Sequence, residues 1–292
     1  MKIRNLLLKI FFASFALLPL VLLYFFSDFL AFVIRHIIQY RKKIIVANLR
    51  KCFPEKNEKE IKKISRKFYR NLSDLIVELI KSQRITPEQF DKRVVFKNQE
   101  VLDDLYSEKK SVFALLGHCG NWEWAGNKIA LFLKHDGGAI YKPLLDKFFD
   151  DYMVKQRQKY KETLMIDYRK VFRTLVALKD KLMTVFVLAD QSPARDEMGY
   201  FINFFGHQTA FYGGTEKVAR ALNYAVLYLD VSRVRRGFYE VEIKTITKNA
   251  KETKEGFITS EYVRLLENTI RNQPDNWLWS HKRWKKQEGK NQ

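Results

Sequence analysis

Residues 111–126 contain the residue types that acid–base chemistry needs. A short apolar run ends just before His118, which lies in a glycine-flanked turn, and a helical pattern begins near Trp122 with Glu123 in its first turn. His118 and Glu123 cannot face each other on one continuous helix, but across a turn the carboxylate can reach an imidazole nitrogen. Such a pair fixes the tautomer of the histidine and raises its basicity, so His118 could take a proton from a hydroxyl.

The elements that must position this pair follow from the pattern beyond residue 93. Short strand-like runs alternate there with helix-length segments, which predicts an α/β fold with a mixed, mostly parallel sheet flanked by helices. Ligands bind in such folds at the loops that follow the carboxyl ends of the strands, where helix N-termini offer N–H donors. We expect the last two runs to be antiparallel neighbours at the sheet edge. The predicted strands are 94–96, 111–116, 139–141, 163–166, 183–188, 200–204, 226–231 and 238–246, and the predicted helices are 122–133, 145–159, 170–179, 213–222 and 260–272.

An apolar segment, residues 10–34, stands near the N-terminus, and Asp28 is its single charged residue. Because about 20 apolar residues in a helix cross the hydrocarbon core of a bilayer, we predict a transmembrane or membrane-inserted helix. A cleaved signal peptide and a buried core helix are the alternatives. The apolar run is long for a signal peptide, and no small-residue cleavage site follows it before Arg35. More basic residues follow the segment than precede it, which favours a cytoplasmic C-terminal side.

Residues 35–93 carry much of the protein's positive charge. They hold 17 Lys and Arg against 7 Asp and Glu, whereas the whole chain has a net charge of +20. Residues 58–82 have apolar positions three and four apart, which predicts an amphipathic helix. We therefore divide the chain into a membrane anchor (1–34), a basic amphipathic helical juxtamembrane region (35–93) and an α/β catalytic domain (94–292).

The composition and the missing motifs exclude several classes of protein. The apolar content, 47% of the residues, is too high for a disordered chain. Cys52 and Cys119 are too few for a disulfide framework or a structural zinc site, and they suggest a reducing compartment. The sequence has no G-x-S-x-G elbow, H-E-x-x-H helix, Walker A loop or G-x-G-x-x-G turn, so serine hydrolases, metallohydrolases and nucleotide-binding enzymes lose their usual support.

The string that joins His118 to Glu123 resembles a known signature. An H-x4-E spacing after an apolar strand resembles the lysophospholipid/glycerolipid acyltransferase superfamily. The fuller wording, G-H-C-G-N-W-E, more narrowly resembles the late (lauroyl/myristoyl) acyltransferases of lipid A biosynthesis. H-x4-E alone is a weak signal, whereas the G-N-W-E wording is a fairly specific one.

Other stretches extend this resemblance over nearly the whole chain. Lys142 stands where the family's Y-R-P element has arginine, which weakens the case for two-pronged phosphate binding there. Lys282 and Trp284 are conservative departures in the terminal motif. The matching stretches are VANLRKCFPE at 46–55, YKP at 141–143, Arg157, the pair Asp190 and Gln191, FFG at 204–206, and PDNWLWSHKRWK at 274–285.

The resemblance implies an enzyme that transfers a fatty acyl group from acyl carrier protein to a hydroxyl of a phosphorylated glucosamine lipid, a lipid A precursor. The reaction would take place at the cytoplasmic face of the bacterial inner membrane. The resemblance also implies that His118 is the general base and that Glu123 orients it. Arg157 would contact a phosphate or the oxyanion, with Asp190 as its partner.

The remaining expectations concern supporting residues and partners. We expect backbone N–H groups near Gly120 and Asn121 to hold the oxyanion, and Lys142 to contact substrate. We expect no metal or other cofactor and no nucleic-acid partner. The positive charge would speed the encounter with an acidic carrier protein and a phosphorylated lipid.

Two alternatives remain open from the sequence. The same chemistry could serve another glycolipid or a lysophospholipid acceptor, or a CoA thioester donor. A more distant alternative, motivated by the net charge of +20, is a non-enzymatic, membrane-tethered binder of anionic lipid or nucleic acid. Charge alone, however, explains neither the arrangement of His118 and Glu123 nor the matching strings.

Overall fold

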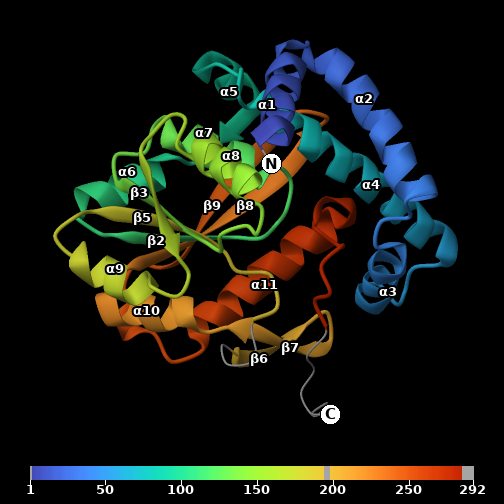
Figure 1. Ribbon diagram of the computed structural model, residues 1–292. Helices are drawn as coiled ribbons and strands as arrows, with labels where there is room; N and C mark the ends of the chain where they lie inside the picture. The colour runs from blue at the N-terminus through green and yellow to red at the C-terminus, as the bar shows by residue number, and fades with distance from the viewer. Residues whose placement is uncertain (1, 194–197, 285–292) are drawn as a thin grey trace.

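A computed structural model describes residues 2–193 and 198–284 of the 292-residue chain (Figure 1). The predicted anchor and catalytic domain each extend slightly beyond these ranges. Lys285, the last residue of the terminal stretch that resembles the family, lies outside the described residues.

A seven-stranded sheet forms the centre of the molecule, with the strand order β1-β9-β8-β2-β5-β3-β4. All neighbouring strands are parallel except β8 and β9, so the predicted mostly parallel sheet is confirmed. The antiparallel pair lies one strand in from the edge, because β1 pairs with the outer side of β9. The strands are β1 (Val94–Phe96), β2 (Val112–Leu116), β3 (Asp136–Tyr141), β4 (Thr163–Asp167), β5 (Met183–Leu188), β8 (Ala225–Arg235) and β9 (Phe238–Thr247).

Strand β2 is buried along its whole length because helices cover both faces of the sheet. Alternate side chains enter two separate cores. Phe113 packs with the cluster that includes α11, whereas Ala114 packs with the cluster that includes α7. The helices that flank or extend the sheet are α5 (Pro87–Arg93), α6 (Glu100–Ser107), α7 (Trp122–Ala130), α8 (Lys147–Arg157), α9 (Val171–Ala177), α10 (Gly214–Leu222) and α11 (Phe257–Asn272).

Besides α5, the juxtamembrane region contains the helices α3 (Lys42–Cys52) and α4 (Glu58–Lys81). The predicted amphipathic helix at 58–82 is therefore confirmed. Its start is fixed by a capping box, in which Asn57 accepts backbone N–H groups of the first turn and Glu60 accepts the N–H of Asn57.

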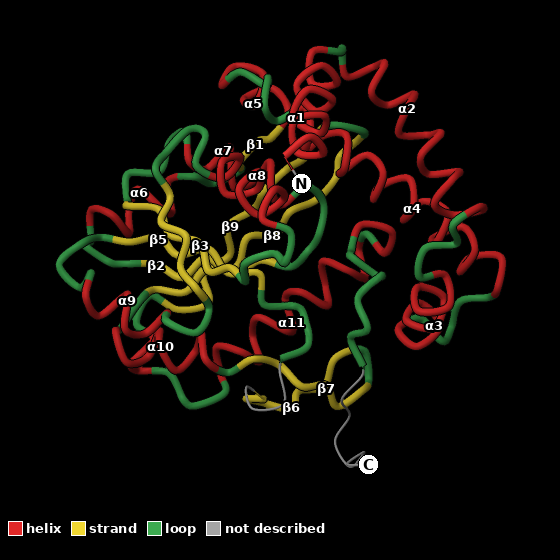
Figure 2. Tube along the Cα trace, viewed as in Figure 1, coloured by secondary structure: helices red, strands yellow, loops and turns green. Residues whose placement is uncertain are grey.

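A second, two-stranded sheet pairs β6 (Met198–Phe204) with β7 (His207–Tyr212) and lies next to α11 (Figure 2). Strand β7 is not among the strands expected from the sequence. Its first residues are polar, and the turn before it is built from Phe205 and Gly206, both with positive φ. A phenylalanine in the left-handed region is unusual, so the two-residue hairpin loop carried no clear sequence signal.

The N-terminal apolar segment contains the predicted apolar helix, but the helix does not run unbroken through residues 10–34, because the segment is divided in two. Helix α1 (Lys2–Leu17) ends before Pro19, and α2 (Leu20–Phe32) begins after it and continues into a π-helical turn, η1 (Val33–Ile37). Proline lacks the N–H that a continuous helix would need there, and its ring clashes with the preceding turn. Within the described residues one stretch, Leu20–Ile37, is long and apolar enough to cross a membrane.

Candidate active site

His118 and Asp190 meet because their strands are parallel neighbours. Leu116 of β2 pairs with Leu188 of β5, so the residues two positions farther along both strands leave the same edge of the sheet together. His118 Nδ1 lies 2.6 Å from Asp190 Oδ1. The loop geometry depends on Gly120, whose φ of +58° lies in the left-handed region that favours glycine.

Asp190 is a buried carboxylate, with only 2% of its surface exposed. Its Oδ2 accepts the backbone N–H of His118 at 3.0 Å and the indole N–H of Trp277 at 2.7 Å. Burial alone would raise the pKa of Asp190, but the charge of His118 and these hydrogen bonds outweigh burial and lower the pKa to about 2. The carboxylate therefore stays ionised and holds a proton on Nδ1, which leaves Nε2 of His118 as the basic nitrogen.

Glu123 has a different partner from the one expected. It lies in the first turn of α7 and forms a two-pronged ion pair with Arg157, the last residue of α8. Arg157 Nε lies 3.0 Å from Glu123 Oε2, and Arg157 Nη2 lies 2.7 Å from Glu123 Oε1. The expected pairs, His118 with Glu123 and Arg157 with Asp190, are thus exchanged. Strand register decides the partner of His118, whereas the N-terminus of α7 faces α8.

Trp122 connects the two pairs. Its ring lies edge-on to the ring of His118, with centroids 4.9 Å apart, and its indole N–H donates to Glu123 Oε1 at 3.0 Å. Glu123 therefore restrains the imidazole indirectly, through the tryptophan. The side chain of Gln191 approaches the second ring nitrogen of His118, with its Nε2 3.4 Å from Nε2 of His118.

Gly120 and Asn121 do not have the expected role of oxyanion donors. The N–H of Gly120 donates to the carbonyl of Asn276 at 3.0 Å, so it is not available to an oxyanion. Asn121 is fully buried and caps α7, accepting the N–H of Trp124 at 2.9 Å. Both residues therefore shape the loop instead of facing substrate. Lys142 is exposed and lines the pocket described next.

A pocket of about 660 Å³ opens beside the histidine. His118, Glu123, Arg157 and Gln191 line its polar end at the carboxyl edge of the sheet. Strands β3 and β5 and helices α7 and α8 line the rest, mostly with apolar side chains. The pocket follows β3 from Tyr141 back to Gly137, a distance of roughly 13 Å at the usual strand rise. The arrangement is a basic nitrogen at the head of a deep apolar pocket.

Sequence reasoning did not assign roles to Trp122, Gln191 and Trp277. Gln191 adjoins Asp190, and both tryptophans stand in stretches that match the family. The sequence therefore marks these residues, but it does not indicate where their side chains point. Trp277 reaches the site because the chain after α11 returns along the loop of His118, where Leu278 donates its N–H to the His118 carbonyl.

Comparison with known protein families identifies the chain. The search of the curated proteins found no match. The family model for bacterial lipid A biosynthesis acyltransferases matches residues 3–286, which is nearly the whole chain. The match includes both members of the His118–Asp190 pair and the Glu123–Arg157 pair. The protein is therefore an acyltransferase and belongs to the bacterial lipid A biosynthesis acyltransferase family.

Proposed function

We propose that the protein transfers a fatty acyl chain from an acyl carrier protein thioester to a hydroxyl of a phosphorylated glucosamine lipid, with His118 as the general base. The observation that carries this proposal is the position of His118, which is paired with a buried, ionised Asp190 and stands at the head of an apolar pocket. An aspartate in this position keeps the imidazole in the tautomer that presents its basic nitrogen to substrate.

The reaction needs one proton-transfer group and one oxyanion donor. His118 Nε2 takes the proton of the acceptor hydroxyl as the oxygen attacks the thioester carbonyl. The tetrahedral oxyanion collapses, the carbon–sulfur bond breaks, and the imidazolium returns the proton to the leaving thiolate. Gln191, beside Nε2, replaces Gly120 and Asn121 in our assignment of the oxyanion donor.

The Glu123–Arg157 pair serves binding in this proposal. A guanidinium has five N–H donors, and the two used by Glu123 leave others for an acceptor phosphate. Glu123 fixes the plane of the guanidinium and holds Trp122 against the imidazole. The apolar pocket would hold the acyl chain, with its carbonyl carbon at the polar end near His118.

Charge and apolar surface are consistent with the proposed partners and location. The net charge of +20 favours a negatively charged carrier protein and a phosphorylated lipid. The apolar N-terminal helices would attach the enzyme to the inner membrane, with the α/β domain, residues 94–292, on the cytoplasmic side.

The test is product analysis with defined substrates. The purified protein is supplied with acyl carrier protein thioester and a phosphorylated glucosamine lipid, and the lipid is analysed by mass spectrometry. We expect one added acyl ester, and little product when acyl-CoA replaces the carrier-protein thioester. Acylation of a lysophospholipid but not of the glucosamine lipid would contradict the proposed acceptor, and equal use of acyl-CoA would contradict the proposed donor.

A further inference from the structure

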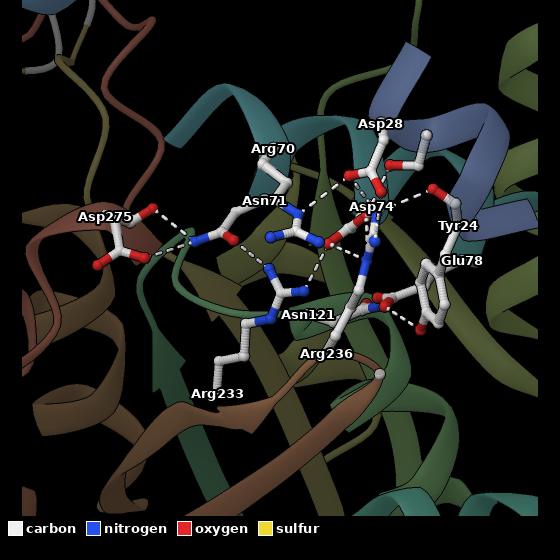
Figure 3. Close-up of polar contacts among 12 residues, drawn as sticks. Tyr24, Asp28, Arg70, Asn71, Asp74, Glu78, Asn121, Arg233, Arg236 and Asp275 are labelled. Carbon is white, nitrogen blue, oxygen red and sulfur yellow. Dashed lines mark hydrogen bonds and ion pairs between the residues drawn. The ribbon is translucent and has the colours of Figure 1, made fainter. Parts of the chain in front are cut away.

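Helix α2 carries polar side chains on the face that meets the rest of the protein (Figure 3). Tyr24 donates its hydroxyl to Glu78 Oε1 at 2.7 Å, and Ser27 donates to Asp74 Oδ1 at 2.6 Å. Both acceptors lie on α4 and are fully buried. The packing of α2 on α4 is therefore specific, and it supplies partners to two buried carboxylates.

Asp28 extends this contact to the tip of the β8–β9 hairpin. It accepts hydrogen bonds from Arg236 Nη1 at 2.8 Å and from Arg70 Nε at 3.0 Å. Arg236 also pairs with Asp74 and donates to the Tyr24 carbonyl at 3.0 Å. Asp28 stands at the middle of the stretch Leu20–Ile37, where a spanning helix would cross the centre of the bilayer.

The corner between α1 and α2 is also held by the body of the protein. The ammonium of Lys81, at the end of α4, donates to the carbonyl of Ala16 at 2.9 Å and to that of Leu18 at 2.8 Å. These carbonyls lie at the end of α1, where no helical partner remains for them. A lysine ammonium is stable in water or among lipid headgroups and not in the hydrocarbon core. The turn between α1 and α2 is therefore expected at the level of the headgroups.

The outer faces of both helices are apolar and exposed. Only 11% of the Leu20–Ile37 stretch is buried. Cations flank this surface at both ends, with Arg4 and Lys9 on α1 and Arg41 and Lys42 just beyond η1. The most exposed of the large apolar side chains of α2 are Val21, Phe25, Phe29 and Phe32.

The apolar surface continues to the mouth of the pocket. Phe12 of α1 contacts the rings of Phe148 and Phe149 on α8, and Arg4 pairs with Asp146 at 2.9 Å. The loop before α8 places Leu145, fully exposed, at the pocket lining. A lipid surface lying against α1 and α2 would therefore reach the opening beside the histidine.

We propose that α1 and α2 lie in the plane of one membrane leaflet, apolar face in the hydrocarbon and polar face on the protein, and that neither helix crosses the bilayer. The occupant of this surface is the acyl-chain region of a leaflet with anionic headgroups, which the flanking cations attract. A crossing α2 would either carry Asp28, Asp74 and Arg236 into the hydrocarbon or leave the buried carboxylates without partners. This proposal rests on the membrane location in the proposed function.

Cysteine labelling tests the topology. Cys52 and Cys119 are buried, so single cysteines can be added at Lys9 on α1, at Leu18 in the corner and at Lys42 beyond η1. Lys179→Cys, on the exposed side of the α/β domain, reports the side on which the body lies. Each variant is treated with a membrane-impermeant maleimide in spheroplasts and in inside-out vesicles.

We expect all three N-terminal positions to react from the same side as Lys179→Cys, whichever side that is. Reaction of any of them from the opposite side, or failure of Leu18→Cys to react from the side of the body, would overturn the in-plane arrangement. If all four positions react only in spheroplasts, the cytoplasmic location in the proposed function is wrong and the in-plane arrangement stands.

Vesicle binding tests the occupant. The double variant Phe25→Ser, Phe29→Ser should bind vesicles of phosphatidylethanolamine and phosphatidylglycerol at least tenfold more weakly than the wild-type protein. Phe172→Ser is the matched control, because Phe172 is an exposed aromatic residue on α9, away from both helices. An unchanged affinity of the double variant, or an equal loss in the control, would overturn the proposed surface.

Discussion

At the scale of single residues, the site depends on which carboxylate reaches which cation. The sequence predicted all four members, His118, Glu123, Arg157 and Asp190, but it reversed their pairing. Types and spacing along the chain favour near neighbours, whereas the register of β2 on β5 joins residues 72 positions apart. No sequence feature specified that register. The same limit explains why Trp277 was not recognised as a partner of Asp190.

The charge on Asp190 predicts a pH-dependent stability. Its pKa is about 2 in the folded protein, below the ordinary value of 3.8, so it contributes stability above pH 4 that is lost as pH falls toward 2. The contribution is about 2 kcal/mol. Urea unfolding at pH 5 and at pH 2.5 should show that Asp190→Asn loses about 2 kcal/mol less than the wild-type protein between these values. Parallel losses in the two proteins would contradict the ionised state of Asp190.

At the scale of the elements, the strands of the main sheet and the long helix α4 were predictable from the pattern of apolar residues. A strand buried on both faces is an apolar run, and a helix buried on one face has apolar residues three and four positions apart. Short elements whose stability comes from tertiary contacts did not, as β7 and α3 show. The break at Pro19 was visible in the sequence and should have divided the apolar segment. The loop of His118 leads into the N-terminus of α7, which the sequence pattern did predict as the helix 122–133.

Asn121 is expected to be a structural anchor for that helix. Asn121→Ala removes the cap of α7, worth about 1 kcal/mol. It also removes one of the three side-chain donors that buried Glu78 has among the described residues, worth a further ~1–3 kcal/mol. Asn57→Ala is the matched control, because Asn57 caps α4 at the surface and should cost about 1 kcal/mol. Urea denaturation measures both, and equal losses would contradict the buried role of Asn121.

Gly126 is expected to set the width of the pocket midway along α7. A Cβ added there meets no atom within 4 Å, and the residue lines the pocket. Gly126→Ala should therefore stabilise the fold by about 0.5–1 kcal/mol through helix propensity alone. Gly126→Leu should lower the rate with the longest acyl donor at least tenfold relative to a shorter donor. An unchanged preference would mean that the acyl chain does not lie in this pocket.

At the scale of the whole molecule, net charge and apolar surface affect how the enzyme meets its substrates and the membrane. They do not affect the chemical step. The charge of +20 should make the KM for an acyl carrier protein donor rise steeply with salt, while kcat changes little. Steady-state kinetics between 50 mM and 300 mM NaCl would measure this. A KM that is independent of salt would argue against electrostatic capture of the donor.

General-base catalysis by His118 is tested most directly by the rate of acyl transfer by His118→Ala under single-turnover conditions. We expect a loss of roughly 10²- to 10⁴-fold at saturating substrate, the usual range for removal of a general base. Leu175→Ala, a core substitution on α9 away from the pocket lining, controls for reduced stability. Transfer by His118→Ala within a few-fold of the wild-type rate would contradict the role of His118 as the general base.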